Sequence, residues 1–261
     1  MPIIDIQLSP ATTDWPTLRT AAREAESRGY GALWVLDHLA GLPLGGHTMI
    51  EAFTLLGALA EATDRIELGT MVANAWNRQP GTLVTAIASV AHVAERQVHL
   101  GLGAGAAPGS SWAIEQDLVG TRLAPELTDR HDRVAQILDL IDEQWADDRD
   151  ERWATFPLPR PRPTTLLGVN SPELARLAAQ RADGVNVLWY HPRKDDFIAA
   201  YEAAVGDRPF LRTTYATYSP ELLDPDTPER REMAERGFDR VVLAVLHDVE
   251  AWLDDDIAPT G

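Results

Sequence analysis

An aspartate and a histidine stand side by side at Asp37 and His38, directly after a short apolar run that ends at Leu36. An imidazole titrates near neutral pH, so His38 could donate or accept a proton, while Asp37 could orient it or bind a ligand. Adjacent side chains of a regular strand point to opposite faces, so at most one of the two projects along the strand end before the chain turns. The alternative is a strand-end aspartate that only caps backbone N–H groups.

A glycine-rich stretch, Gly-Leu-Gly-Ala-Gly at 101–105, closes a second apolar run. It does not continue as GxGxxG and no helix pattern follows at once, which disfavours a Rossmann nucleotide site. The glycines of this stretch would let a flat ring approach the main chain closely. They could equally mark a bend that the strand needs for its own packing.

A third stretch, Gly168-Val169-Asn170-Ser171-Pro172, runs from an apolar segment into a helix pattern. Ser171 followed by Pro172 fits an N-cap with proline at the first helical position. The free N–H groups and the positive end of the helix dipole there could bind an anion such as a phosphate. An ordinary helix cap without a ligand explains the same residues.

These candidates fall at the ends of strands in a chain that alternates strands with helices. Between the strands, apolar residues recur with helical spacing, as in Val134, Ile137, Leu138 and Ile141. A capping box at Thr48 and Glu51 fits the start of one such helix. Strand patterns occupy Ile3–Leu8, Ala32–Leu36, Arg65–Val72, Val98–Gly103, Thr164–Val169, Gly184–Trp189, Pro209–Thr217 and Arg240–Leu246.

Eight such units predict an α/β fold, a single (β/α)8 TIM barrel over residues 1–261, and 261 residues match the usual size of ~250. Two stretches near 106–126 and 147–163 interrupt the alternation and are interpreted as insertions. In such barrels the site lies at the carboxyl ends of the strands. The pattern therefore predicts that the three candidate stretches share one site.

The composition and motifs of the chain argue against several classes of function. A net charge of −17 disfavours contact with nucleic acid. The chain has no cysteine, no HExxH or GxSxG motif and no His spacing typical of a metal site, so we expect no metal. No secretory signal or long apolar run is present, so we expect a cytoplasmic protein without a membrane span.

Three motifs together resemble the luciferase-like oxidoreductases, and most closely their deazaflavin (coenzyme F420) branch. The resemblance extends through the run from Ala182 to Asn186, so it covers about Gly29 to Trp189. Its residues are Gly29-Tyr30-Gly31-Ala32-Leu33-Trp34-Val35-Leu36-Asp37-His38, Arg65-Ile66-Glu67-Leu68-Gly69-Thr70 and Leu100-Gly101-Leu102-Gly103-Ala104-Gly105.

The resemblance implies a cofactor over the barrel mouth, a non-prolyl cis peptide at Met71-Val72 and a homodimer formed through helices two and three. It also implies that the loop after strand five holds the cofactor phosphate. The cofactor-binding residues it predicts are Asp37, Met71, Val72, Asn74, Gly103, Ala104, Gly168, Val169, Asn170 and Ser171.

The predicted activity is hydride transfer between coenzyme F420 and a small organic substrate, with His38 as the catalytic acid or base. The sugar phosphate dehydrogenases of this branch add a tryptophan and a glutamate, but Leu42 and Ala106 stand at those places here. That sugar is therefore not the expected substrate. If His38 does not move the proton, water, Tyr190 or His191 could supply it. An FMN-dependent monooxygenase and a non-catalytic cofactor-binding barrel remain the alternatives.

Overall fold

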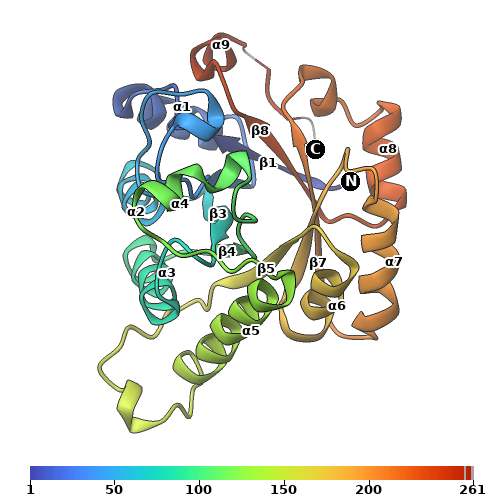
Figure 1. The fold of residues 1–261 in the computed structure, drawn as a ribbon. Helices are drawn as coiled ribbons and strands as arrows, with labels where there is room; N and C mark the ends of the chain where they lie inside the picture. The colour runs from blue at the N-terminus through green and yellow to red at the C-terminus, as the bar shows by residue number, and fades with distance from the viewer. Residues whose placement is uncertain (256, 260–261) are drawn as a thin grey trace.

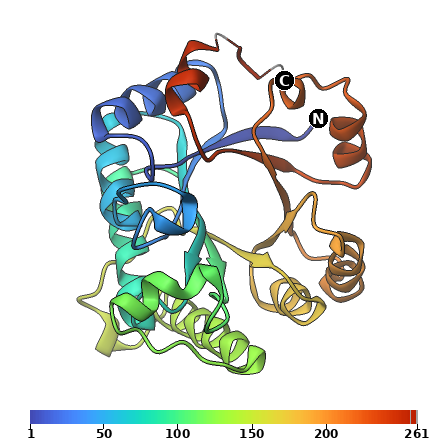
Figure 2. The same ribbon diagram turned by 45° about the horizontal axis from the view of Figure 1, so that its top comes forward.

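The computed structural model describes residues 1–255 and 257–259, so residues 256, 260 and 261 of the expected domain lie outside the described residues. Parallel strands close into a barrel in the order β1 to β8 and back to β1, as Figures 1 and 2 show. The predicted (β/α)8 barrel is thereby confirmed. The strands are β1 (Ile3–Leu8), β2 (Ala32–Val35), β3 (Glu67–Asn74), β4 (Val98–Gly103), β5 (Thr164–Val169), β6 (Gly184–Leu188), β7 (Leu211–Thr217) and β8 (Arg240–Val245).

Helices surround the barrel and bury their apolar stripes against it. The large apolar core lies in this layer between helices and strands. None of the described helices is both long and apolar enough to cross a membrane. The helices are α1 (Trp15–Ser27), α2 (Ala52–Ala62), α3 (Pro80–Ala94), α4 (Ile114–Leu118), α5 (Leu127–Gln144), α6 (Pro172–Arg181), α7 (Lys194–Val205), α8 (Pro228–Glu235) and α9 (Val249–Asp254).

The observed boundaries correct some predicted ones. Strand β3 begins two residues later than predicted and runs two residues further, to Asn74, because a bulge between Thr70 and Ala73 lets pairing with β4 resume beyond Val72. The predicted capping box at the start of α2 was wrong, since Glu51 itself is the N-cap and accepts the N–H of Thr54.

The two predicted insertions behave differently. Residues 147–163 project away from the barrel beyond α3 and α5, at the lower left of Figure 1. Residues 106–126 instead carry a short 3-10 turn, Ser111–Ala113, and α4. This segment lies at the mouth of the barrel, where Glu115 contacts the side chain of His38 and the backbone N–H of Leu39, both of which follow β2.

The inside of the barrel is partly polar. In β1 the side chains of Ile4, Ile6 and Leu8 join the outer core, so the alternating Asp5 and Gln7 face inward, and both are fully buried. Arg240 pairs with Asp5, with its Nε 2.9 Å from Oδ2, and this pair lies at the amino-terminal end of the strands. Such polar contacts at that end of a barrel serve stability.

The bulge in β3 depends on a missing side chain in the next strand. A Cβ atom on Gly101 would overlap the backbone carbonyl oxygen of Thr70, whose hydroxyl donates to the carbonyl of Gly101 at 2.8 Å. The peptide between Met71 and Val72 is cis, which confirms the prediction made from the resemblance. Gly101 therefore serves the packing of the strand itself, one of the two explanations left open above.

The variant Gly101→Ala tests this contact. We expect it to lower the free energy of unfolding by ~1–3 kcal/mol, because the added methyl meets main chain that cannot move aside cheaply. Urea titration measures the change. Gly81→Ala is the matched control, since a Cβ at Gly81 in α3 meets no atom within 4 Å and should leave stability unchanged or slightly raised.

Candidate functional site

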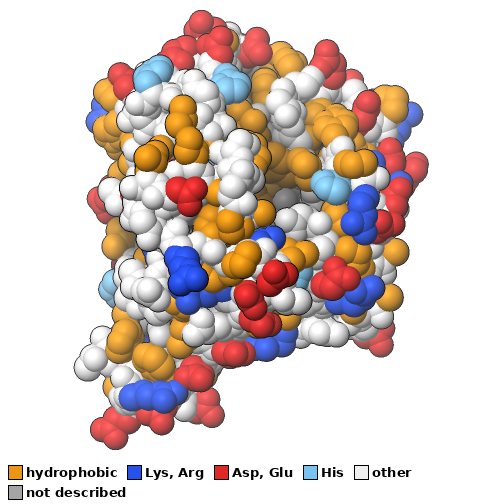
Figure 3. All heavy atoms as spheres, viewed as in Figure 1, with side chains coloured by type: hydrophobic (Ala, Val, Ile, Leu, Met, Phe, Trp, Pro, Cys, Tyr) orange, Lys and Arg blue, Asp and Glu red, His pale blue; other side chains and the backbone are white. Residues whose placement is uncertain are grey.

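A pocket of about 560 Å³ opens at the carboxyl ends of the strands. Figure 3 shows a hollow with hydrophobic side chains around it, near the middle of the visible face. The predicted residues that line the pocket are Asp37, His38, Met71, Val72, Asn74, Gly103, Ala104, Gly168, Val169 and Asn170. The structure thus brings together all of the predicted site residues except Ser171.

Val72 forms the floor of this pocket together with two glycines. A Cβ on Gly103 would lie 2.6 Å from one methyl of Val72, and a Cβ on Gly168 would lie 2.7 Å from the other. Strands β4 and β5 therefore leave room for the side chain that the bulge of β3 pushes toward them. Neither glycine can gain a side chain without displacing Val72.

A buried chain of hydrogen bonds supports the floor from below. Gln7 donates from Nε2 to the carbonyl of Met71 at 2.6 Å, and the hydroxyl of Tyr215 donates to Oε1 of Gln7 at 2.8 Å. Burial raises the pKa of Tyr215 well above its usual range, so the phenol remains protonated. The main chain of the bulge is thereby held from β1 and β7.

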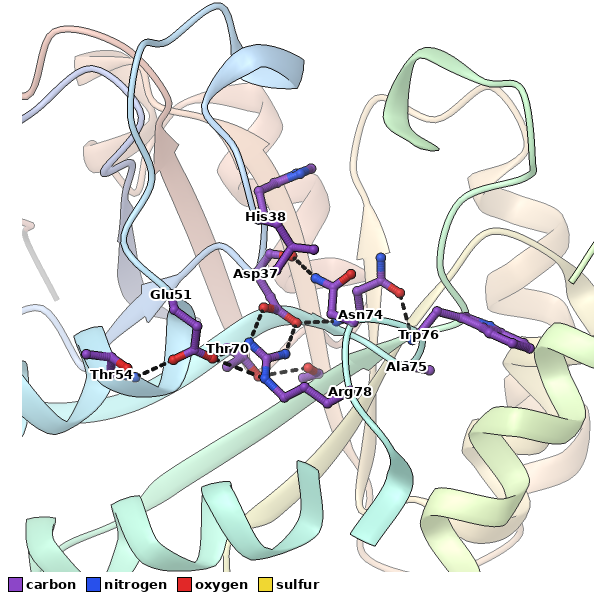
Figure 4. A network of polar contacts seen from close by, with 12 residues as sticks. Asp37, His38, Glu51, Thr54, Thr70, Asn74, Ala75, Trp76 and Arg78 are labelled. Atoms are coloured by element: carbon purple, nitrogen blue, oxygen red, sulfur yellow. Dashed lines mark hydrogen bonds and ion pairs between the residues drawn. The ribbon is translucent and has the colours of Figure 1, made fainter. Parts of the chain in front are cut away.

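The carboxylate of Asp37 is bound by other residues of the protein. Its two oxygens accept hydrogen bonds from the two terminal nitrogens of Arg78, each at 2.8 Å, and Oδ2 also accepts the N–H of Asn74. Arg78 binds Glu51 on its other side, as Figure 4 shows. Burial opposes the charge of Arg78, but its bonds to the two carboxylates raise its pKa above the usual value. Asp37 therefore fixes the end of β3.

His38 points away from the carboxylate of Asp37 (Figure 4), so the two neighbours serve different partners. Its Nδ1 lies 2.9 Å from Oε1 of Glu115 on α4, and the ring of Trp112 stands 5.8 Å away, centroid to centroid. The side chain of Glu115 is only 1% exposed, whereas that of His38 is 19% exposed and lines the pocket. The insertion before α5 thus supplies both neighbours of the imidazole.

Two residues of this chain, Leu42 and Ala106, stand where the resemblance expects a tryptophan and a glutamate. Leu42 is exposed and does not line the pocket, whereas Ala106 does line it. An indole and a carboxylate nevertheless approach His38, from Trp112 and Glu115. The residue types are those that the resemblance expects. The tryptophan comes from the segment after β4 instead of the one after β2, and the glutamate comes from a later position in the segment that begins with Ala106.

The loop after β5 and an arginine from α5 line the same pocket. The hydroxyl of Ser171 caps α6 by accepting the N–H of Leu174 at 3.1 Å, which confirms the predicted cap. Arg130 lines the pocket, donates to two backbone carbonyls of the chain before α5, and has a buried Nε without a partner among the described residues. A positive charge therefore lies in the same pocket as Asn170.

The predictions named two residues that do not line the pocket and missed others that belong to the site. Tyr190, proposed as an alternative proton source, is 61% exposed, and neither it nor His191 lines the pocket. Asn186 and Tyr215 do line it, and their polar side chains within predicted strands were a signal that sequence reasoning could have used. Glu115 gave no such signal, because 77 positions separate it from His38.

Among the described residues, no group of three or more His, Asp or Glu side chains could hold a metal ion. The pocket combines polar side chains, among them Asp37, His38 and Asn74, with apolar ones such as Met71, Val72 and Leu188. Such a mixed lining is typical of sites for small organic ligands.

Comparison with known proteins places the chain in a family. The model of the luciferase-like monooxygenases matches residues 4–253, so the chain belongs to this family, as the resemblance predicted. An F420-dependent glucose-6-phosphate dehydrogenase of Microbacterium testaceum is 28% identical over 171 residues, 61% of this chain and 48% of that protein. A 5,10-methylenetetrahydromethanopterin reductase of Methanolobus tindarius is 27% identical over 230 residues, 84% of this chain and 66% of that protein.

The chain thus spans between about half and two thirds of the length of these relatives. Among solved structures, an F420-dependent secondary alcohol dehydrogenase in complex with an F420-acetone adduct superposes with a TM-score of 0.75. It is 18% identical, and the match covers 97% of both chains, which supports the barrel fold.

The variant Arg78→Met tests the role of the ion pair with Asp37. It leaves a buried carboxylate without its partner, so we expect a loss of ~3–5 kcal/mol in the free energy of unfolding, measured by urea titration. Arg231→Met breaks an exposed pair with Asp226 and should cost less than ~1 kcal/mol. Equal effects of the two variants would contradict a structural role for the buried pair.

Proposed function

We propose that this protein is an oxidoreductase that transfers a hydride between coenzyme F420 and a small organic substrate, with His38 as its acid or base. The observation that carries the proposal is the placement of the His38 imidazole beside a glycine-lined pocket at the strand ends. The names of its relatives support the choice of cofactor.

The residues present fit a flat ring with an anionic tail. The floor of Val72 between Gly103 and Gly168 offers a surface free of polar side chains against which a ring can lie. Arg130, with its unpartnered Nε, and the main chain of Gly168, Val169 and Asn170 would hold the phosphate-bearing end. Ser171 would act only through the start of α6, and Asp37 only through Asn74 and Arg78.

A bound deazaflavin supplies a two-electron hydride carrier. The contribution of the chain is the matching movement of a proton at His38, whose ring lines the pocket. A neutral imidazole accepts the proton of a substrate hydroxyl, and an imidazolium donates one to a carbonyl oxygen. The phenol of Tyr215 already donates to Gln7, and its raised pKa keeps it from acting as a base.

The lining of the pocket favours an uncharged substrate. Arg130 is the sole Lys or Arg side chain among the described residues that line the pocket, and we assign it to the cofactor. Trp112 lies beside His38, and Ala107, Leu188 and Ser110 also line the pocket. A compact alcohol, ketone or activated alkene suits this lining better than a phosphorylated sugar.

Titration of the protein with coenzyme F420 and with FMN tests the choice of cofactor. We expect saturable binding of coenzyme F420 and at least ~10-fold weaker binding of FMN, which corresponds to ~1.4 kcal/mol. Preference for FMN would favour the monooxygenase alternative.

In His38→Ala, affinity for coenzyme F420 should stay within a few-fold while turnover falls by ~100-fold or more.

Proportional losses of binding and turnover in His38→Ala would make His38 a binding or structural residue. Tight binding of coenzyme F420 without hydride exchange toward any of a panel of alcohols and ketones would favour the non-catalytic alternative. Asp117→Asn is a suitable control, since Asp117 is exposed on α4 and its side chain makes no contact with the pocket.

We also propose that the protein forms a homodimer through α2 and α3. These helices are rich in apolar residues and line a shallow groove that contains Phe53, Gly57, Ala86 and Val90. Val93, which also lines this groove, is 50% exposed. An exposed groove of apolar residues is a surface that can pack against another protein molecule.

Light scattering tests this dimer. The wild-type protein should have twice the mass of the chain at micromolar concentration, and Val93→Glu should yield monomers because it places a charge in an apolar contact. Ala203→Glu on the exposed side of α7 should remain dimeric. A wild-type monomer would contradict the proposal.

A further inference from the structure

Glu115 is an unusual side chain for an insertion at a barrel mouth, because its carboxylate is almost completely buried. It accepts hydrogen bonds on both oxygens. Oε2 accepts the backbone N–H groups of Leu39 and Ala40 at 2.9 and 3.0 Å. Oε1 lies 3.0 Å from Nε2 of Gln116 and 2.9 Å from Nδ1 of His38.

The orientation of Gln116 is fixed by a chain of donors that begins at the main chain. The carbonyl oxygen of Asp37 can only accept, so it binds Nδ2 of Asn77 at 2.9 Å. This turns Oδ1 of Asn77 toward Gln116, whose Nε2 donates to it at 2.8 Å. The same Nε2 group therefore presents its second hydrogen to Oε1 of Glu115.

Three of the four groups around the carboxylate are thus obligate donors, and an ionised carboxylate can only accept. Burial opposes this charge, but the bonds to His38 and to the two backbone N–H groups lower the pKa of Glu115 below its usual value. The fourth group, Nδ1 of His38, must then carry a hydrogen. No residue in the described part of the chain bonds the opposite ring nitrogen, Nε2.

We propose that Glu115 is a positioning residue that holds His38 in the tautomer with the proton on Nδ1, so that Nε2 is the atom that accepts or donates the catalytic proton. The inference rests on the proposed function, in which His38 moves that proton. In the neutral ring the lone pair of Nε2 is free to accept the hydrogen of a substrate hydroxyl. In the reverse direction Nε2 returns the same proton to a carbonyl oxygen, and Glu115 stays ionised throughout.

The backbone contacts of Glu115 predict what the substitution Glu115→Gln does. A glutamine has one acceptor oxygen, which the N–H groups of Leu39 and Ala40 require. Its NH2 group would then face Nδ1 of His38, which could bind it only without a hydrogen. The proton of the neutral imidazole would move to Nε2, and Nε2 could then no longer accept the hydrogen of a substrate hydroxyl.

Nitrogen-15 NMR of the protein without cofactor tests this directly, because the shift of each ring nitrogen reports whether it carries a proton. In its neutral form the wild-type ring should be protonated at Nδ1 and bare at Nε2, and Glu115→Gln should reverse this. With coenzyme F420 bound, Glu115→Gln should lose at least ~100-fold in kcat for alcohol oxidation while its affinity for the cofactor changes less than ~3-fold.

Asp117→Asn, an exposed acid two residues further along α4, is the matched control and should leave both the tautomer and kcat unchanged. A wild-type ring with its proton on Nε2 would overturn the inference, and this measurement needs no variant to fold. An unchanged tautomer in a folded Glu115→Gln would also overturn it. The predicted tautomers without any F420-dependent turnover would support the role of Glu115 and count against the proposed function alone.

Discussion

The bulge in β3 is the constraint on which the rest of the site depends. It leaves Val72 out of register with β4, and the side chain fits only because Gly103 and Gly168 have none. The displaced main chain needs hydrogen-bond partners, which Gln7 provides at Met71 and Asp37 provides at the N–H of Asn74. A buried polar group without a partner costs several times what a hydrogen bond contributes, so these contacts and the bulge stabilise one another.

This use of Asp37 also explains the position of His38. Since Asp37 turns toward β3 and Arg78, the next side chain turns the other way and meets the insertion that carries α4. Trp112 and Glu115 reach it there. The two adjacent residues at this strand end therefore have different roles. Asp37 stabilises the floor of the pocket, and His38 faces the space above it.

Much of the fold could be predicted from the sequence, because each β/α unit has its own local pattern. The bounds of β1, β4 and β5 were predicted correctly, but β3 was displaced because a bulge changes the register without changing the apolar pattern. The strand ends also located most of the pocket. Sequence reasoning missed Arg78 and Glu115, since their partners are distant in the chain. It missed Arg130 because the place of this side chain in the pocket depends on how the segments fold over the barrel.

A crystal structure of the protein with coenzyme F420 would test the central claim most directly, namely that the ring rests on the floor formed by the bulge and faces His38. We expect the deazaflavin ring against Val72, Nε2 of His38 directed toward its reacting face, and the phosphate near Arg130 and the main chain of Gly168 and Val169. A ring bound elsewhere, or in this pocket with Nε2 turned away from it, would contradict the account.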